Sequence, residues 1–346
     1  MKLFSSSDST DLPPARIAAA FARALDVARH YVGATMPNPP VGCVLLDRHG
    51  NELAAAAHHK AGAQHAEALA LQLCAEAGTT AAIHTAVVTL EPCNHHGRTP
   101  PCSEALLATP VRTVWIACAD PNSHVAGGGA RRLAAAGVTV RFLAELATPD
   151  AADLLGKAQR PIAPFAKRSR TGLPFVVVKQ ALNSAGSMIP PVGQTTFTSP
   201  SSLDLAHRLR READAILTGS GTILADDPAF TVRRVADHAG KRRPLVILDR
   251  RGRVSQRYLA GAQERSFVPS IATDLATALA ELGAAGCLSV LVEAGLSLTQ
   301  TILASALWDE HVLIEQAADG GADRVSIRQR ISSDITGKDH DVFRHH

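Results

Sequence analysis

The chain has 346 residues, of which 46% are hydrophobic and 19% are charged. A chain this long exceeds what one hydrophobic core usually organises, so the length favours two domains, and the hydrophobic content excludes global disorder. The formal net charge of +3 is too small to indicate a nucleic-acid surface, although it is compatible with a basic cleft for a phosphorylated small molecule.

Cysteine usage and the N-terminal segment bear on the cellular compartment. Six cysteines are spaced irregularly, unlike a disulfide framework, and this favours a cytoplasmic location. Residues 1–14 are rich in serine and aspartate and lack the apolar core of a signal peptide, so we expect a disordered tail there. No apolar run approaches the length that spans a bilayer, which predicts no membrane partner.

Helix and strand patterns alternate through the first part of the chain. Helices are predicted at residues 15–32, 66–78, 103–108 and 131–137, and strands at 41–46, 52–57, 85–90, 111–119 and 138–143. This order predicts a three-layer α/β/α domain over residues 15–150. Residues 151–172 contain Pro161 and Pro164 and a basic run, and we interpret them as a linker that follows a short helix.

The second part, residues 173–346, shows the same alternation. Strands are predicted at 173–179, 215–217, 245–248, 288–293 and 312–315, and helices at 201–213, 275–282 and 296–304. Such alternation favours a mostly parallel sheet in a second α/β domain. No strand is followed by Gly-x-Gly-x-x-Gly, which disfavours a Rossmann dinucleotide fold.

The segments around His65, Glu67, Cys93 and Cys102 carry the clearest chemistry. One histidine and two cysteines supply three ligands for a tetrahedral Zn²⁺ and leave the fourth position for water, as in catalytic sites. Glu67 is then placed to move protons to and from that water. Residues two apart point away from each other in a regular helix, so His65 and Glu67 can flank one metal only at a first turn. The structural alternative, two buried free cysteines, does not explain two Pro-Cys pairs downstream of His-Ala-Glu.

This signature is that of zinc-dependent nucleobase deaminases, except that eight residues separate the two cysteines in place of the usual two. The longer Cys-Asn-His-His-Gly-Arg-Thr-Pro-Pro-Cys loop resembles that of the bifunctional riboflavin-biosynthesis deaminase/reductase family. The resemblance implies a cytidine-deaminase-like fold for the first domain. It also implies that Asn38, in a Pro-Asn-Pro-x-Val-Gly segment, and His58, shortly before Ala-Gly, bind the pyrimidine. Without the resemblance, Asn38 would be interpreted as a turn residue and His58 as a solvated loop residue.

Three later motifs resemble the reductase half of the same family: Gly-x-Gly-Thr-x-Leu-Ala-Asp-Asp-Pro from residue 219, Thr-Val-Arg at 231–233 and Glu-Ala-Gly at 293–295. That half is similar to dihydrofolate reductase in fold and uses NADPH to reduce a ribose ring to a ribityl chain. The resemblance implies dinucleotide binding by small residues that let the backbone approach phosphate, namely Thr218, Gly219, Gly221, Thr222 and Gly295. It implies substrate contacts from Lys179, Thr198, Arg210, Asp226, Arg233 and Glu293.

The residues that the reductase resemblance points to have other interpretations. The charged ones among them, Arg210 above all, could equally be solvated surface groups. Arg250 or Arg251 could bind the 2'-phosphate of NADPH, although two neighbouring arginines are more often simply exposed to solvent. The family's Lys-x-Ala-x-Ser-Leu-Asp-Gly has lost its serine and aspartate at residues 179–186, and residues 316–346 lack the usual apolar strand.

The expected function is zinc-dependent deamination of 2,5-diamino-6-(ribosylamino)pyrimidinone 5'-phosphate, followed by NADPH-dependent reduction of its ribosyl group. The alternatives are a deaminase with a catalytically degenerate reductase-like domain, a nucleic-acid base deaminase and a structural zinc protein. With 4% aromatic residues and little net charge, a nucleic-acid partner is not expected. A homo-oligomer is implied by the family resemblance alone.

Overall fold

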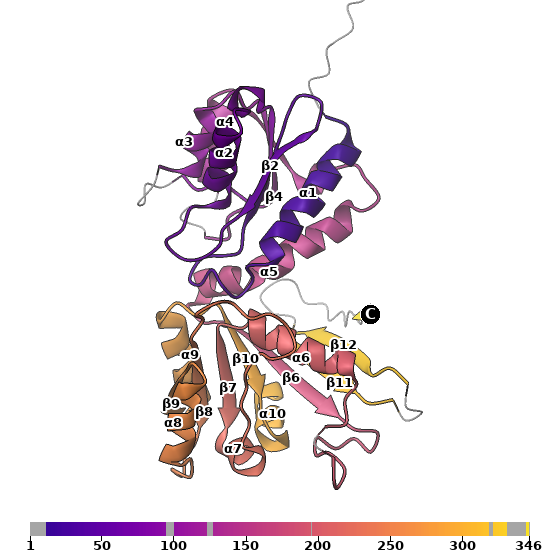
Figure 1. The fold of residues 1–346 in the computed structure, drawn as a ribbon, viewed down its shortest axis with the longest axis vertical. Helices are drawn as coiled ribbons and strands as arrows, with labels where there is room; N and C mark the ends of the chain where they lie inside the picture. The colour runs from indigo at the N-terminus through magenta and orange to yellow at the C-terminus, as the bar shows by residue number, and fades with distance from the viewer. Residues whose placement is uncertain are drawn as a thin grey trace, which may run out of the picture. The chain divides into compact units, whose positions relative to one another are not determined.

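The computed structural model describes residues 12–94, 100–122, 127–194, 196–317, 321–330 and 344–345. Contacts along the chain divide it into two compact units, Met1–Arg170 and Thr171–His346 (Figure 1). Of the expected N-terminal tail, residues 1–11 lie outside the described residues, and the first helix already begins at Pro14. No helix of the described part is both long and apolar enough to cross a membrane.

The first unit follows the predicted order of helices and strands. Its elements are α1 (Pro14–Arg29), β1 (Gly42–Leu46), β2 (Glu52–Ala57), α2 (Ala66–Glu76), η1 (Thr80–Ala82), β3 (Thr85–Leu90), α3 (Cys102–Leu107), β4 (Thr113–Cys118), α4 (Gly128–Ala135), β5 (Thr139–Phe142), η2 (Leu143–Glu145) and α5 (Ala151–Thr171). The five strands form one sheet in the order β2-β1-β3-β4-β5. Strand β1 is antiparallel to β2 and β3, whereas β3, β4 and β5 run parallel.

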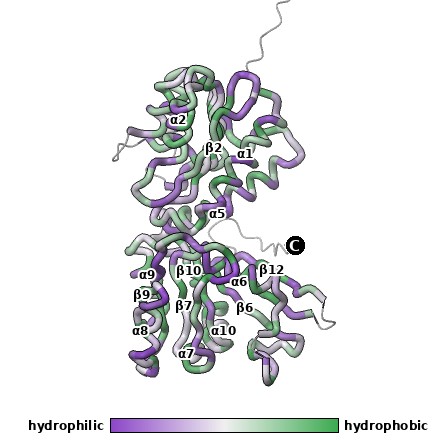
Figure 2. Tube along the Cα trace, viewed as in Figure 1, coloured by the Kyte–Doolittle hydropathy of each residue, from purple (hydrophilic) through white to green (hydrophobic). Residues whose placement is uncertain are grey.

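Two apolar clusters cover the two faces of this sheet. Residues of α2, α3 and α4 pack on one face, including Ala70, Leu106 and Leu133. Residues of α1 and α5 pack on the other, including Phe21 and Leu154. Strands β1 and β3 are buried along their whole length, as expected of strands covered on both sides. The predicted three-layer α/β/α architecture is therefore confirmed, and hydrophobic and hydrophilic stretches alternate along its trace (Figure 2).

Residues 151–171, interpreted from the sequence as a linker after a short helix, form one 21-residue helix, α5. Leu154, Ala158 and Ile162 recur every four residues and are buried, two of them in the cluster that contains α1. Burial of this stripe stabilises a helix whose local sequence, with Pro161 and Pro164 inside it, disfavours one. The contact boundary accordingly lies after Arg170, at the end of this helix.

The second unit is also α/β. Its elements are β6 (Phe175–Leu182), α6 (Pro200–Glu212), β7 (Ala215–Gly219), α7 (Ser220–Asp226), β8 (Arg243–Leu248), α8 (Gln256–Glu264), β9 (Phe267–Ala272), α9 (Leu275–Ala284), β10 (Ser289–Glu293), α10 (Leu296–Leu303), β11 (Glu310–Glu315), β12 (Arg324–Gln329) and β13 (Arg344–His345). The sequence pattern missed α7, α8, β9, β12 and β13. The strands form one sheet in the order β13-β12-β11-β6-β10-β7-β8-β9.

Six strands of this sheet, from β11 to β9 in that order, run parallel, and β12 and β13 add antiparallel pairs at one end. The mostly parallel sheet is thus confirmed. The C-terminal region does contain a strand: β12 pairs with β11 along its length although its sequence is Arg-Val-Ser-Ile-Arg-Gln. An exposed strand needs no continuous apolar run, which explains why the pattern missed it.

Candidate active sites

The predicted zinc ligands come together from three segments of the first unit. His65 is the N-cap of α2 with an extended backbone (φ −68°, ψ 159°), and Glu67 lies in the first turn of that helix. Cys93 follows β3, and Cys102 is the first residue of α3. The change from extended to helical backbone between His65 and Glu67 allows both side chains to approach one site, as the first-turn argument requires.

The distances fit a small metal ion. The Nδ1 atom of His65 lies 3.6 Å from Sγ of Cys93 and 3.4 Å from Sγ of Cys102. All three ligand atoms lie within 4.8 Å of one another, and the described residues contain no other cluster of this kind. Two sulfurs and one imidazole nitrogen are the donor set that Zn²⁺ prefers, so the residues present fit the predicted metal.

Protonation at this site is set by burial and mutual contact. Burial raises the pKa of Glu67, whose side chain is almost completely enclosed. Hydrogen bonding with Cys102 and with His65 lowers the pKa of the Cys93 thiol. The backbone N–H of Cys102 also donates to the Cys93 sulfur at 3.3 Å. Glu67 is therefore a carboxyl group with a raised proton affinity next to the metal ligands, as a proton-transfer group requires.

Asn38 and His58, expected to bind the pyrimidine, contact each other beside the metal ligands. Nδ1 of His58 lies 2.9 Å from the carbonyl oxygen of Gln64, and a carbonyl can only accept, so His58 carries its proton on Nδ1. Its Nε2 then accepts from Nδ2 of Asn38 at 3.3 Å. This chain of hydrogen bonds directs the amide nitrogen of Asn38 toward His58 and leaves its Oδ1 to accept from a donor. The His58 ring also meets the His65 ring edge to face at 5.5 Å.

A residue that sequence reasoning passed over, Glu91, holds the loop that follows β4. Its buried carboxylate accepts hydrogen bonds from the backbone N–H groups of Asp120, Gly127 and Ala130. The glycine run at 127–129, a weak phosphate signal in the sequence, thus meets this internal carboxylate at the start of α4. The only sequence signal for Glu91 was its position two residues before Cys93.

Residues 95–99 of the metal loop and residues 123–126 lie outside the described residues.

In the second unit the structure brings together Lys179, Arg210 and Glu293. Arg210 donates from Nε and Nη2 to the two carboxylate oxygens of Glu293, and the latter bond is 2.8 Å long. Nζ of Lys179 lies 3.8 Å from Oε2 of Glu293. Burial alone would raise the pKa of Glu293, but the Arg210 guanidinium outweighs it and the pKa is lowered. Arg210 is therefore a partner of Glu293 and not a solvated surface charge.

No described hydrogen bond or ion pair joins the other predicted substrate residues, Thr198, Asp226 and Arg233, directly to this cluster. Arg233 is exposed, and its backbone N–H donates to Nδ1 of the buried His207, which also interacts electrostatically with Arg210 and Glu293. His207 was not singled out from the sequence, where a lone histidine inside a helix gives no signal. Asp226 is exposed at the end of α7, and Thr198 lies in the loop before α6, in contact with Thr196.

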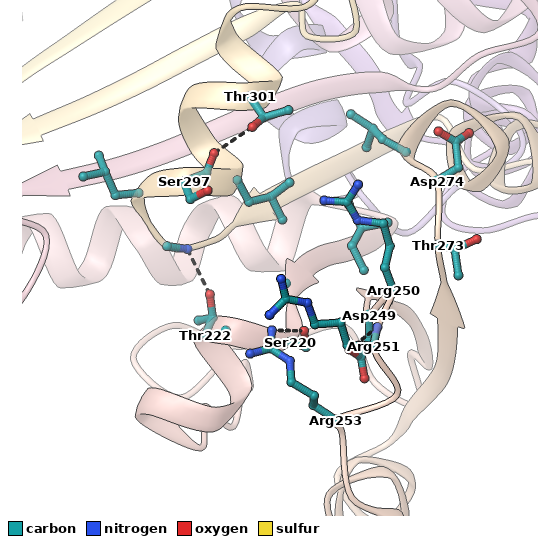
Figure 3. Close-up of a pocket in the computed structure, with 17 residues that line it drawn as sticks. Ser220, Thr222, Asp249, Arg250, Arg251, Arg253, Thr273, Asp274, Ser297 and Thr301 are labelled. Atoms are coloured by element: carbon teal, nitrogen blue, oxygen red, sulfur yellow. Dashed lines mark hydrogen bonds between the residues drawn. The ribbon is translucent and has the colours of Figure 1, made fainter.

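A cleft of about 610 Å³ lies at the carboxyl ends of the parallel strands of the second unit (Figure 3). Four of the five residues predicted to line a dinucleotide border it: Gly219, Gly221, Thr222 and Gly295. The fifth, Thr218, does not, because it lies fully buried inside β7. Open sheets of this type bind ligands at their carboxyl edge.

Further residues of the cleft were not chosen from the sequence. Arg253 donates to the Ser220 hydroxyl at 2.8 Å, and Thr222 accepts from the backbone N–H of Gly295 at 2.9 Å. Thr273, Asp274, Ser297 and Thr301 complete the polar part of the lining, and Arg250 and Arg251, considered for a 2'-phosphate, also border it. Small residues, hydroxyl groups and three arginines fit a ligand with several phosphates.

Residues 179–186, which differ from the family's sequence pattern, still contain a hydrogen-bonded turn. Oδ1 of Asn183 accepts from the backbone N–H groups of Ala185 and Ser187, both at 2.9 Å, and Gly186 has φ +75°. An asparagine that bonds two residues onward stabilises a turn. The altered sequence therefore still ends β6 in a defined turn.

Two family models match the chain. The cytidine and deoxycytidylate deaminase zinc-binding region matches residues 15–118, and the RibD C-terminal domain matches residues 180–330. The first match contains His65, Glu67, Cys93 and Cys102. The second contains the residues of the cleft and Arg210 and Glu293.

Individual proteins match as well. The riboflavin biosynthesis protein RibD of Mycobacterium tuberculosis is 43% identical over 229 residues, which is 65% of this chain and 63% of that protein, slightly under two thirds of its length. RibD of Escherichia coli is 35% identical over 325 residues and is covered over 85% of its length. Two solved structures, RibD of Acinetobacter baumannii and a diaminohydroxyphosphoribosylaminopyrimidine deaminase/5-amino-6-(5-phosphoribosylamino)uracil reductase of Thermotoga maritima, superpose with TM-scores of 0.71 and 0.73, identities of 29% and 27%, and coverage of 87% and 89% of those chains.

Proposed function

Because the chain belongs to the RibD family of bifunctional riboflavin-biosynthesis deaminase/reductases, we propose that it catalyses two consecutive steps of riboflavin formation. The first step is the hydrolytic deamination of 2,5-diamino-6-(ribosylamino)pyrimidinone 5'-phosphate in the first unit. The second is the NADPH-dependent reduction of its ribosyl group in the second unit. The observation that carries the proposal is the convergence of His65, Cys93 and Cys102 beside the buried carboxyl group of Glu67.

In the deaminase step, a Zn²⁺ held by His65, Cys93 and Cys102 would supply a Lewis acid that makes a water molecule acidic near neutral pH. Glu67 takes the proton of that water and delivers it to the amine that leaves as ammonia. Its raised pKa suits both transfers, because the group must accept and release a proton within one cycle. Asn38 orients the pyrimidine through its Oδ1, which the bond to His58 keeps available.

In the reductase step, NADPH would supply the hydride, and the chain supplies binding and orientation. The cleft residues Gly219, Gly221 and Gly295 let the backbone approach phosphate. Lys179 and Arg210 present positive charge around Glu293 and favour the anionic phosphoribosyl substrate, whose sugar would contact this cluster.

An assay of ammonia release and NADPH oxidation on one preparation tests both steps. Turnover of the diamino substrate to ammonia, with NADPH oxidised in equal amount, supports the proposal. Ammonia release without NADPH oxidation, also when the deaminated intermediate is supplied, would support the alternative of a deaminase with a degenerate reductase-like domain. Absence of ammonia release from the zinc-loaded protein would reject the proposal.

We also propose that the partners are small molecules and that the protein is cytoplasmic. The net charge of +3 and the 4% of aromatic residues support a small-molecule substrate over a nucleic acid. The irregular spacing of the six cysteines, unlike that of a disulfide framework, supports a reducing compartment. Binding of single-stranded RNA at low salt would contradict the first statement, and sedimentation would test whether the chain self-associates as the family resemblance implies.

A further inference from the structure

Two side chains of α6 anchor the two ends of the loop segment 231–234. At one end, Nη1 of Arg210 donates to the carbonyl oxygen of Thr231 at 3.4 Å. At the other end, the carboxylate of Asp204 accepts from Nε of Arg234. The segment therefore lies against the helix between these two anchors and runs antiparallel to it.

His207 occupies the helical turn between the anchors and supplies a third contact. It lies three residues from each of them, so the three side chains are neighbours on the surface of the helix. Its Nδ1 atom is 2.9 Å from the backbone nitrogen of Arg233, and a backbone N–H can only donate. Nδ1 is therefore unprotonated, and the proton of the neutral ring lies on Nε2.

The surroundings of His207 keep its ring neutral. The residue is 5% exposed, and burial together with the Arg210 charge lowers the pKa of the imidazole. Arg233 and Arg234 lower this pKa further, whereas Glu293 opposes them. A charged ring would carry a proton on Nδ1 and could not accept the Arg233 N–H, so the neutral ring is the form that makes the contact.

The contact fixes the backbone of Arg233 and leaves its side chain available. The guanidinium is exposed, and within the described part of the chain no hydrogen bond or ion pair engages it. Its neighbour Arg234 differs, because it is bound to Asp204 and to the carbonyl oxygen of Pro200. An arginine side chain has many rotamers, so an anchored backbone limits where the Arg233 guanidinium can lie.

We infer that His207 is a positioning residue of the reductase site: through Nδ1 it holds the Arg233 backbone on α6, and so places the Arg233 guanidinium where it binds the phosphate of the substrate. The inference rests on the proposed reductase function, in which Arg233 is a predicted substrate contact, and adds the group that orients that contact. Paired hydrogen bonds between a guanidinium and a phosphate depend on geometry, so a loosened Arg233 backbone weakens substrate binding.

The test compares replacements of His207 that remove or keep the acceptor, all in the full chain. His207→Leu and His207→Ala remove it, the second without added bulk, whereas His207→Asn keeps an amide oxygen on the γ carbon, the atom that carries Nδ1 in histidine. Arg208→Ala is the matched control, because Arg208 is the next residue of α6 and is exposed. KM and kcat for the deaminated intermediate, KM for NADPH and thermal unfolding are measured in each variant.

Both variants without the acceptor are expected to raise the KM for the deaminated intermediate roughly tenfold, with kcat and the KM for NADPH within about twofold of the wild type. His207→Asn should restore this KM to within about threefold of the wild-type value, because its oxygen accepts the Arg233 N–H. Arg208→Ala should change none of these quantities. Lower thermal stability with an unchanged KM would show a purely structural role for His207 and overturn the inference.

A double-mutant cycle with Arg233→Ala separates positioning from an independent contribution of His207. If His207 acts through Arg233, His207→Ala should raise the KM no further in a protein that already lacks the Arg233 guanidinium. Losses that multiply in the double variant would overturn the inference and leave the proposed function intact. A wild-type protein that does not oxidise NADPH with the deaminated intermediate would reject the reductase function itself.

Discussion

Glu67 is the residue whose role depends most on its surroundings. It is 3% exposed, and burial raises the pKa of its carboxyl group, so it can hold a proton at a pH where a solvated glutamate is ionised. It lies in the first turn of α2, two residues after the predicted metal ligand His65. A carboxyl group with this environment serves proton transfer better than metal ligation.

Replacing Glu67 by glutamine should separate catalysis from metal binding. We expect the Glu67→Gln variant to release ammonia about 10²–10⁴-fold more slowly, because an amide cannot act as a general acid or base near neutral pH, and to keep its zinc. Ammonia assays and metal analysis check the two parts. Glu76→Gln, at the exposed far end of the same helix, should behave like the wild type. Loss of zinc from Glu67→Gln would show that the carboxylate is a ligand.

The Arg210–Glu293 pair predicts a pH dependence of stability. The pKa of Glu293 is lowered in the folded state, so its ionised form stabilises the fold above the unfolded pKa of about 4.3. This contribution is lost as the pH falls through the lower, folded pKa. The Glu293→Gln variant leaves Arg210 buried without its anion and should be less stable at pH 7 by about 3 kcal/mol.

Denaturant unfolding of the wild type and Glu293→Gln between pH 7 and pH 3 measures this effect. The difference between the two proteins should be constant near neutral pH and should shrink below about pH 4.3. A difference that stays constant over the whole range would mean that the ionisation of Glu293 does not contribute to stability.

At the scale of elements, the metal site depends on how closely α4 approaches the loop after β3. A Cβ atom on Gly129 would lie 1.8 Å from the carbonyl oxygen of Pro92, the residue before Cys93. No side chain fits in this space, so α4 can pack here only through a glycine. At the start of this helix, the Glu91 carboxylate accepts hydrogen bonds from the backbone N–H groups of Gly127 and Ala130.

The Gly129→Ala variant should therefore displace α4 or the metal loop and destabilise the first unit by about 1–3 kcal/mol. Zinc affinity should fall with it, because Cys93 would move from its position. Gly156→Ala is the matched control: it lies in α5 with nothing within 4 Å of the added Cβ, and it should stabilise by roughly 0.5–1 kcal/mol. Thermal unfolding and zinc titration distinguish the two; equal behaviour of both variants would contradict the packing argument.

At the scale of the whole molecule, the two candidate sites belong to different compact units. The residues of the candidate zinc cluster all belong to the first unit, and the residues that line the cleft all belong to the second. A change at one candidate site therefore leaves the residues of the other site in place.

Removal of zinc with a chelator should abolish ammonia release and leave the NADPH-dependent reduction of the deaminated intermediate within about twofold of its original rate. The physical reason is that all three predicted metal ligands belong to the first unit. Parallel assays before and after chelation, and after zinc is restored, check this. Loss of both activities on chelation, recovered together by zinc, would show that the metal also supports the second unit.

The sequence by itself predicted the candidate metal cluster of the first unit and determined the class of both folds. His65, Cys93 and Cys102, with Glu67 beside them, could be proposed because metal ligation strongly restricts residue type and spacing. The alternation of apolar patterns likewise predicted two α/β units, because helix and strand periods differ.

Only the tertiary structure decided the features that depend on long-range burial. Residues 151–171 form a helix because packing against α1 outweighs two prolines, and β12 is a strand because β11 offers it a partner. Arg210 of α6 pairs with Glu293 of β10 only because the fold brings these two elements together, and Thr218 proves to be buried inside β7 and not in the cleft. Such pairings carry no local sequence signal, because each residue has the same local pattern whether its neighbour is water or another strand.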